Sequence, residues 1–302
     1  MAIAEGYHQK WQARAKVNLD LLITGRREDG YHLLDSLVIF PDVGDDIFLA
    51  PSAELCLDIQ GPFAEGLSRG EDNLVMRAAR AIRQEGCPSV KIILQKNLPV
   101  ASGIGGGSAD AAATLRALNE YWQLNYSMEA LSNIGVTLGA DVPACLRQQH
   151  LRLYGVGDVL LPFDLQDDLW IVLVNPGDTL STPAVFRAWG QMGQAFRHRQ
   201  PAGSNVAHIP SSIEFDLNSL IQAIEKSGNM LTPAACRLYP DIEGVVQTIS
   251  QQSECLYAGM SGSGATCFGL FADVAAAQRA VTHLHRASPA WWVQAAQVEK
   301  NL

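Results

Sequence analysis

The sequence predicts a two-domain protein of the α+β class. At 302 residues, the chain is long enough to build two separate hydrophobic cores. Strand-like runs are interleaved with helical runs, and this pattern restarts after Leu161-Pro162-Phe163, as expected for helices packed on small sheets. We therefore expect an N-terminal domain over residues 1–165 and a C-terminal domain over residues 166–302.

Composition favours a cytoplasmic protein that has neither membrane nor nucleic acid as a partner. Hydrophobic residues make up 48% of the chain, but no run approaches the length of a bilayer span. The net charge of −9 disfavours a nucleic-acid surface. The six cysteines are scattered without a C-x-x-C pair, so we expect reduced core residues and no zinc site. The N-terminus lacks a basic and apolar leader, which predicts a reducing compartment.

The first predicted element is a β-hairpin over residues 14–40, reversed by a polar turn that ends at Gly30. Apolar residues alternate along its first strand from Ala15 to Ile23. Because neighbouring side chains of a strand point to opposite faces, Lys16, Asn18 and Asp20 share the other face. Three polar groups therefore line up together.

The rest of the first half alternates between strands and helices. We expect a strand pair over residues 45–58, a helix capped at Asn73 that runs to about residue 85, a strand over residues 90–95, a helix over residues 128–138 and a short helix opened by Asp141.

The segment LPVASGIGGGSADAAATLRALN, residues 98–119, joins a glycine cluster to an alanine-rich helix. Glycines let the backbone approach an anion, and the free N–H groups at the start of a helix point at it. We expect Ser108 to be the N-cap and Asp110 to add negative charge to the first turn. The lysine of a Walker A loop and the third glycine of a dinucleotide fingerprint are absent here. The alternative is a flexible glycine turn that only begins a helix.

The sequence after residue 165 predicts a small β-sheet covered by helices. Strands are expected over residues 170–174, 255–257, 266–271 and 291–298, and helices over residues 182–189, 216–226, 242–251 and 274–285. The composition of residues 196–212 predicts a long polar loop or a partly disordered insertion. A second glycine loop, GMSGSGA, occupies residues 259–265.

Three motifs in this order resemble the GHMP kinase superfamily of ATP-dependent small-molecule kinases. They are the strand AKVNL at residues 15–19, the loop at residues 99–108 and the late glycine loop. The resemblance implies an N-terminal domain like ribosomal protein S5 domain 2 and a ferredoxin-like C-terminal domain. RAKVNLDLLITGRREDGYHLLDSL, EDNLVMRAA, LGADVP and GMSGSGATCF are similar to the superfamily branch that acts on a cytidine diphosphate-linked polyol.

That resemblance implies transfer of a phosphate from ATP, with Mg²⁺, to the 2-hydroxyl of 4-diphosphocytidyl-2-C-methyl-D-erythritol in the non-mevalonate isoprenoid pathway. The partner would then be this small-molecule substrate, and we expect a monomer or weak homodimer. Two alternatives stay open. One is a sibling that acts on another alcohol such as mevalonate or homoserine, and the other is a catalytically silent sensor of the same fold.

The resemblance also assigns roles to residues. Asp141 would take or orient the proton of the attacking hydroxyl beside Lys16. Ser108 would lie at the magnesium and the β/γ-phosphates. The remaining nucleotide contacts would come from Asn73, Lys96, Pro99, Ser102, Gly103, Gly105, Gly106 and Gly107. The polyol substrate would be held by Asn18, Tyr31, His32, Phe186, Gly262 and Gly264, with cytosine between Tyr31 and Phe186.

Each assignment has a structural alternative. Asp141 could be a helix cap, Lys16 a solvated strand lysine and Lys96 an exposed loop charge. Tyr31 and His32 could merely flank a turn, with Phe186 as a core aromatic residue. The chain also carries Ala101 and Ser102 where closer relatives usually have glycines, which predicts a more crowded entry to the phosphate loop.

Overall fold

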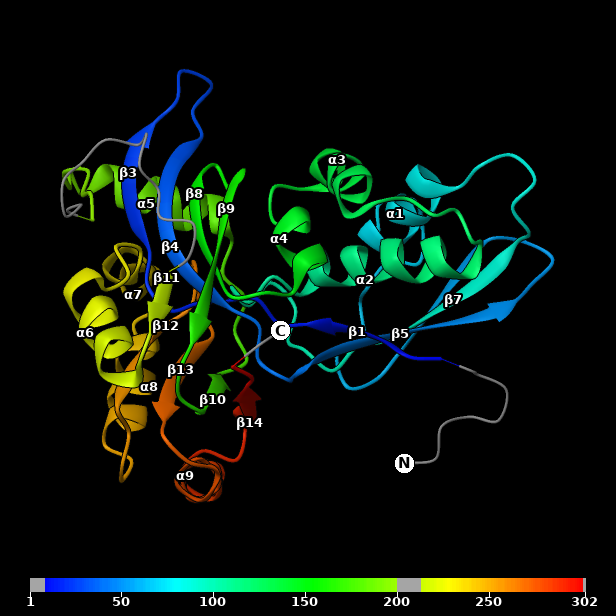
Figure 1. Cartoon of the computed structure of the whole chain (residues 1–302). Helices are drawn as coiled ribbons and strands as arrows, with labels where there is room; N and C mark the ends of the chain where they lie inside the picture. Colours follow the sequence, from blue (N-terminus) through cyan, green and yellow to red (C-terminus); the bar gives the residue numbers. More distant parts are fainter. Residues whose placement is uncertain (1–8, 200–212, 301–302) are drawn as a thin grey trace. The chain divides into compact units, whose positions relative to one another are not determined.

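The computed structural model describes residues 9–199 and 213–300 (Figure 1). Spatial contacts divide the chain into two compact units. Unit 1 runs to Ala15 and adds Gly44–Val100 and Gly105–Gln148. Unit 2 consists of Lys16–Val43, Ala101–Ile104 and the chain from Gln149 onward. The mixture of strands and helices confirms the predicted α+β class.

Unit 1 is built on a four-stranded sheet in the order β1-β5-β7-β6. The predicted strand pair over residues 45–58 is wrong in its pairing, because β7 lies between the two strands and pairs with both. The reason is hydrophobic, since β7 has buried residues along most of its length and is covered best at the centre of the sheet. The strands are β1 (Trp11–Arg14), β5 (Gly44–Pro51), β6 (Cys56–Gln60) and β7 (Val90–Gln95).

Four helices complete unit 1. The longest is α2, whose buried alanines let it pack closely on α1, β1 and β5. The helix predicted to reach residue 85 ends earlier, because the backbone of Arg83 is already extended. The bounds are α1 (Leu74–Ile82), α2 (Gly106–Tyr121), α3 (Met128–Leu138) and α4 (Val142–Arg147).

Unit 2 contains two sheets. One has the order β12-β13-β10-β14, and the other has the order β11-β9-β8-β4-β2, with β3 also paired to β4. The predicted hairpin over residues 14–40 is present, as β4 pairs antiparallel with both β2 and β3. The strands are β2 (Val17–Asn18), β3 (Leu22–Arg26), β4 (His32–Ile39), β8 (Leu151–Gly155), β9 (Val159–Leu165), β10 (Leu169–Asn175), β11 (Ile213–Phe215), β12 (Tyr257–Met260), β13 (Cys267–Phe271) and β14 (Trp292–Val298).

All but one of the unit 2 helices described, α6 being the exception, contribute residues to a core that also includes residues of β3, β10 and β13. The sequence did not predict α7, which is short and has a proline in its first turn. The helices are α5 (Thr182–Gln191), α6 (Leu217–Ser227), α7 (Thr232–Leu238), α8 (Asp241–Ser250) and α9 (Val274–Ala287). Of the predicted polar loop, residues 200–212 lie outside the described residues, and 196–199 form neither helix nor strand.

Candidate active site

The glycine cluster and α2 meet at Gly105, the N-cap of the helix. Gly105 has a φ of 65° and provides no side-chain cap. The prediction that Ser108 is the N-cap is therefore wrong, and Ser108 lies in the first turn instead. Glycine adopts the left-handed conformation without strain, so the helix begins after Gly105, three residues before the predicted cap. The positive end of α2 is thus left without a capping side chain, as an anion site requires.

The middle of the phosphate loop packs on the late glycine loop within unit 2. Gly103 has a φ of +77°, and a Cβ there would lie 2.6 Å from the carbonyl oxygen of Ser261 and 2.7 Å from that of Gly264. The Ser261 hydroxyl donates to the Gly103 carbonyl at 3.0 Å. The Thr266 amide donates to the Ser102 carbonyl, also at 3.0 Å. The two glycine loops, far apart in the sequence, are therefore joined by backbone contacts and hydrogen bonds into one layer, formed by residues 102–104 and 261–266.

Two of the predicted polar residues of the first strand reach the same layer. The Lys16 amide donates to the Ile104 carbonyl at 2.9 Å, and the Asn18 amide donates to the Ser261 hydroxyl at 3.1 Å. The Asn18 side chain donates to the Ser36 hydroxyl at 2.7 Å. Lys16 and Asn18 are both buried, so the solvated-lysine alternative is wrong for Lys16. Gly262 lies at the same place, since a Cβ there would meet the Gly103 carbonyl oxygen at 2.8 Å.

Asp141 is half-buried at the N-cap position of α4. Its side chain makes no capping hydrogen bond, and Pro143 stands in the first turn. The helix-cap alternative therefore does not explain this residue. Asp141 belongs to unit 1 and Lys16 to unit 2, so their proposed pairing stays a prediction.

The Asn73 side chain caps α1. Its Oδ1 accepts from the Val75 amide at 2.9 Å, and its Nδ2 donates to the Ser68 carbonyl at 2.7 Å. A Cβ on Gly107 would lie 3.6 Å from Leu74 Cδ1, which brings the starts of α1 and α2 close together. Asn73 therefore stands near the phosphate loop, and its contact with adenosine stays a prediction.

Lys96 is buried in an ion-pair cluster with Asp45 and Asp110, which we call the Lys96 triad. Its ammonium lies 2.5 Å from Asp45 Oδ2 and 2.7 Å from Asp110 Oδ2. The other Asp45 oxygen accepts from the Asn97 and Leu98 amides, at 2.6 and 2.8 Å. The exposed-charge alternative for Lys96 is wrong, because its side chain is 4% exposed. The triad supports the turn that leads into buried Pro99 and the phosphate loop.

Asp110 differs from its expected role. It lies beyond the first turn of α2, is buried, and contacts Lys96 instead of adding surface charge there. Its other oxygen, Oδ1, is buried without a hydrogen-bond partner. A Cβ on Gly106 would lie 3.2 Å from the Lys96 ammonium, so this glycine lets α2 start directly above the triad. Sequence reasoning missed Asp45, because no local pattern marks it.

Burial and the neighbouring charges shift the pKa values of the Lys96 triad in opposite directions. Burial disfavours the Lys96 ammonium, but Asp110 and Asp45 outweigh burial and raise the pKa of Lys96. Burial raises the pKa of Asp110 well above its usual value, and the Lys96 charge only partly opposes this. One ammonium cannot fully compensate two buried carboxylates, so Asp110 is the group that tends to keep its proton.

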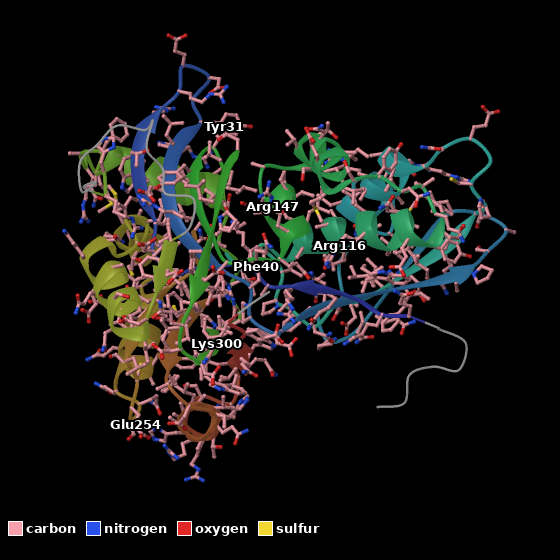
Figure 2. All side chains as sticks on the ribbon, in the orientation of Figure 1. Tyr31, Phe40, Arg116, Arg147, Glu254 and Lys300 are labelled. Atoms are coloured by element: carbon pink, nitrogen blue, oxygen red, sulfur yellow. The ribbon has the colours of Figure 1, made fainter. Side chains whose placement is uncertain are left out.

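The substrate residues of the first hairpin meet α5 within unit 2. The rings of His32 and Phe186 stack with centroids 4.9 Å apart and an angle of 19° between their planes. Burial and the Arg26 charge lower the pKa of His32. Tyr31, which precedes β4, is 65% exposed and is labelled at the end of the hairpin in Figure 2. His32 thus covers one face of Phe186, and the cytosine sandwich between Tyr31 and Phe186 stays a prediction.

Family models match two stretches of the chain. Residues 73–149 match the GHMP kinases N terminal domain, and residues 209–289 match the GHMP kinases C terminal domain. The chain belongs to the GHMP kinase family. The expected resemblance is confirmed. The boundary near residue 165 stays a prediction, because it lies between the two matched stretches.

Curated relatives and solved structures agree with this family. The chain is 45% identical over 287 residues to 4-diphosphocytidyl-2-C-methyl-D-erythritol kinase of Cereibacter sphaeroides, covering 95% of this chain and 98% of that one. It is 46% identical over 290 residues to the Paracoccus denitrificans kinase of the same name, covering 95% and 96%. A crystal structure of 4-(cytidine 5'-diphospho)-2C-methyl-D-erythritol kinase superposes with a TM-score of 0.75 and 31% identity, covering 96% of this chain and all of that one. Leishmania major mevalonate kinase, at a TM-score of 0.66 and 20% identity over 97% of both chains, shares the fold alone.

The residues present fit a nucleotide phosphate group better than a protein-built metal cage. No side chain caps α2 at Gly105, so the backbone N–H groups of its first turn are left for an anion. Among residues 9–199 and 213–300, no three His, Cys, Asp or Glu side chains gather in a group that could hold a metal. That finding is compatible with Mg²⁺, which is usually held by substrate phosphates and few protein ligands. No helix in the same ranges is long and apolar enough to cross a membrane.

We predict that Asp110→Asn changes the pH dependence of unfolding. The raised pKa of Asp110 contributes stability at low pH that is lost as the pH rises through the folded-state pKa. The asparagine variant lacks this loss, so its melting temperature relative to wild type should rise as the pH rises from the ordinary carboxyl range near 4 toward neutrality. Asp58→Asn is the control of opposite sign, because hydrogen bonds from Gln60 and Lys91 lower the pKa of Asp58, so its melting temperature relative to wild type should not rise over the same range. An equal difference at both ends of this range for Asp110→Asn would contradict the argument.

We predict that Gly107→Ala separates nucleotide binding from folding. A Cβ on Gly107 meets nothing closer than 3.6 Å, and alanine in a helix is more stable than glycine by about 0.5–1 kcal/mol. The variant should melt no lower than wild type but lose most of the thermal shift produced by Mg²⁺ and a non-hydrolysable ATP analogue. That shift corresponds to about 2.7 kcal/mol at a hundredfold excess over Kd.

Gly190→Ala is the matched control for this experiment. Gly190 lies in α5, where an added Cβ meets nothing within 4 Å. This variant should keep the full ligand-induced shift. An unchanged shift in Gly107→Ala would mean that the phosphates do not approach this turn.

Proposed function

We propose that this chain transfers the γ-phosphate of ATP to the 2-hydroxyl of 4-diphosphocytidyl-2-C-methyl-D-erythritol, in the non-mevalonate route to isoprenoid precursors. The observation that carries the proposal is 45% identity to a kinase of that name over 95% of the chain. The stacking of His32 on Phe186 supports it, because these are the residues assigned to the cytosine ring.

The phosphate groups of ATP belong at the start of α2. Backbone N–H groups at a helix start favour anions, and Gly103, Gly105, Gly106 and Gly107 let the phosphates approach the chain. The Ser108 hydroxyl would contact Mg²⁺ and the β/γ-phosphates. Ser102 and Pro99 would line the loop, and the adenosine would lie near Asn73. When bound, Mg²⁺ neutralises phosphate charge.

Asp141 and Lys16 are the residues proposed for the transfer itself. The Asp141 carboxylate would accept, or orient, the proton of the attacking hydroxyl. The Lys16 ammonium would keep that carboxylate ionised and favour the developing alkoxide. Because transition states of phosphoryl transfer are loose, charge stabilisation at the phosphate loop is the larger contribution.

His32 is the residue proposed to recognise the base. Its lowered pKa favours a neutral imidazole, which offers one donor and one acceptor to a pyrimidine edge. Tyr31 and Phe186 would supply aromatic surface for stacking, and Asn18 of β2 would contact the ligand together with Gly262 and Gly264 of the late glycine loop. We further propose a cytoplasmic enzyme that is a monomer or weak homodimer and has no nucleic-acid partner; the net charge of −9 supports the last point.

A substrate panel tests the proposed function. We expect ATP consumption with the cytidine diphosphate-linked methylerythritol and less than about one-hundredth of that rate with mevalonate or homoserine, since a missing base contact and stack together forfeit about 3 kcal/mol. His32→Ala should lower kcat/KM for the cytidine substrate by about 10- to 100-fold and leave KM for ATP unchanged. Faster turnover of mevalonate or homoserine would indicate a sibling kinase, and absence of turnover would indicate a silent sensor.

Asp141→Asn tests the proposed catalytic residue. The variant should lower kcat by at least about 10²-fold with nearly unchanged ATP affinity, because it removes the base and leaves the phosphate loop intact. Folding should survive, since the side chain makes no capping hydrogen bond. Lys16→Ala should be comparably damaging and far from additive with it. A near-normal kcat for Asp141→Asn would remove this residue from the mechanism.

A further inference from the structure

Four aromatic side chains of unit 2 form a continuous contact chain, which we call the aromatic column. His32 stacks on Phe186 at 4.9 Å and meets the edge of Trp189 at 5.6 Å with an interplanar angle of 89°. Trp189 in turn stacks on Phe196 at 6.0 Å. Only His32 and Phe186 belong to the proposed base site, so Trp189 and Phe196 need another explanation.

Trp189 is the buried member of this column. It is 3% exposed, whereas Phe196 is 48% exposed. The Trp189 indole N–H donates to Gln194 Oε1 at 3.0 Å. A T-shaped contact fixes both the position and the tilt of the smaller ring. The orientation of His32 is therefore set by α5 as well as by its own strand.

Residues 192–199, which we call the strap, leave α5 and fasten to the first hairpin. The Arg197 amide donates to the Ile23 carbonyl of β3 at 2.9 Å. The Arg197 guanidinium donates to the Ser227 and Lys226 carbonyls at 3.3 and 3.2 Å. These carbonyls end α6, where a cation is favoured by unpaired acceptors and the helix dipole.

Arg199 fastens the end of the strap to two buried carboxylates. Its guanidinium is hydrogen-bonded to Asp20 and lies 3.6 Å from Asp35 Oδ1. Asp35 also receives a two-pronged contact from Arg152 at 3.0 and 2.8 Å. Asp35 is part of β4, the strand that begins at His32. The strap thus binds both strands of the hairpin and holds Phe196 against Trp189.

We propose that Trp189, held by the strap, is a positioning residue that fixes the ring of His32 for recognition of the substrate's pyrimidine. The inference rests on the base site described under Proposed function. It assigns Trp189 no contact with substrate. Loss of the indole should leave His32 present but no longer held in one orientation, so discrimination between pyrimidines should fall before catalysis does.

Steady-state kinetics of Trp189→Leu, with cytidine and uridine forms of the substrate, tests the inference. Because an aromatic pair is worth about 0.5–1.5 kcal/mol, we expect KM for the cytidine substrate to rise by up to about tenfold. The preference for cytidine over uridine should fall by a similar factor, with kcat and KM for ATP within about twofold of wild type. Trp189→Phe should restore most of the loss.

NMR titration of His32 supplies a readout that does not depend on activity. Burial and the nearby charge of Arg26 lower the pKa of His32, and Trp189 packs against its ring. Trp189→Leu should therefore raise the pKa of His32. Arg197→Gln, which loosens the strap at an exposed residue, should shift the pKa and the substrate preference in the same direction, and it serves if Trp189→Leu does not fold.

Phe215→Leu is the matched control. Phe215 is also in unit 2 and makes an edge contact with Phe163 at 5.4 Å and 89°. It should alter neither the preference nor the His32 titration. Wild-type preference in Trp189→Leu and Arg197→Gln, with a loss in His32→Ala, would overturn the inference and leave the proposed function standing. No loss in His32→Ala would overturn the base site and the inference together.

Discussion

The arrangement of unit 2 depends on the close backbone contact at Gly103. A Cβ on Gly103 would lie 2.6 Å from the carbonyl oxygen of Ser261 and 2.7 Å from that of Gly264. Any side chain at this position would therefore force the two glycine loops apart. Lys16 and Asn18 are bonded into the same layer through Ile104 and Ser261. The absence of a side chain at Gly103 therefore lets the first strand and a loop from near the other end of the chain pack on one another.

Each unit contains a cluster of buried ion pairs next to a proposed ligand-binding segment. In unit 1 the Lys96 triad fixes the turn into the phosphate loop, and in unit 2 Asp20 and Asp35 are held by Arg199 and Arg152. Buried ion pairs contribute little net stability, because desolvation offsets much of their attraction. What they contribute is geometry, since removing one partner leaves an uncompensated buried charge. Both clusters join segments that carry proposed ligand contacts to strands that do not.

Local signals in the sequence predicted what local forces determine. The α3 and β7 ranges were predicted in full, because their hydrophobic patterns lie within the elements themselves. The predicted N-cap of α2, Ser108, was wrong, because the helix begins at Gly105 in a left-handed conformation. The sequence pattern does not show which glycine adopts that conformation. Asp45, the separation of β5 from β6 and the contact of Trp189 with His32 were missed, since each depends on a partner distant in the sequence. The motifs of the candidate site were therefore predictable from the sequence. The residues that hold those motifs in place were not.

Fold and specificity have separate origins in this chain. Leishmania major mevalonate kinase shares the fold at a TM-score of 0.66 although only 20% of residues are identical, so a GHMP kinase backbone does not by itself select a substrate. The base-reading function proposed above needs groups that recognise a pyrimidine, and we assign this task to His32 and to the aromatic surface of Phe186, on which it stacks. His32 begins β4 and contacts Phe186 and Trp189 of α5. All of these residues belong to unit 2, so the proposed base site is built by unit 2 alone.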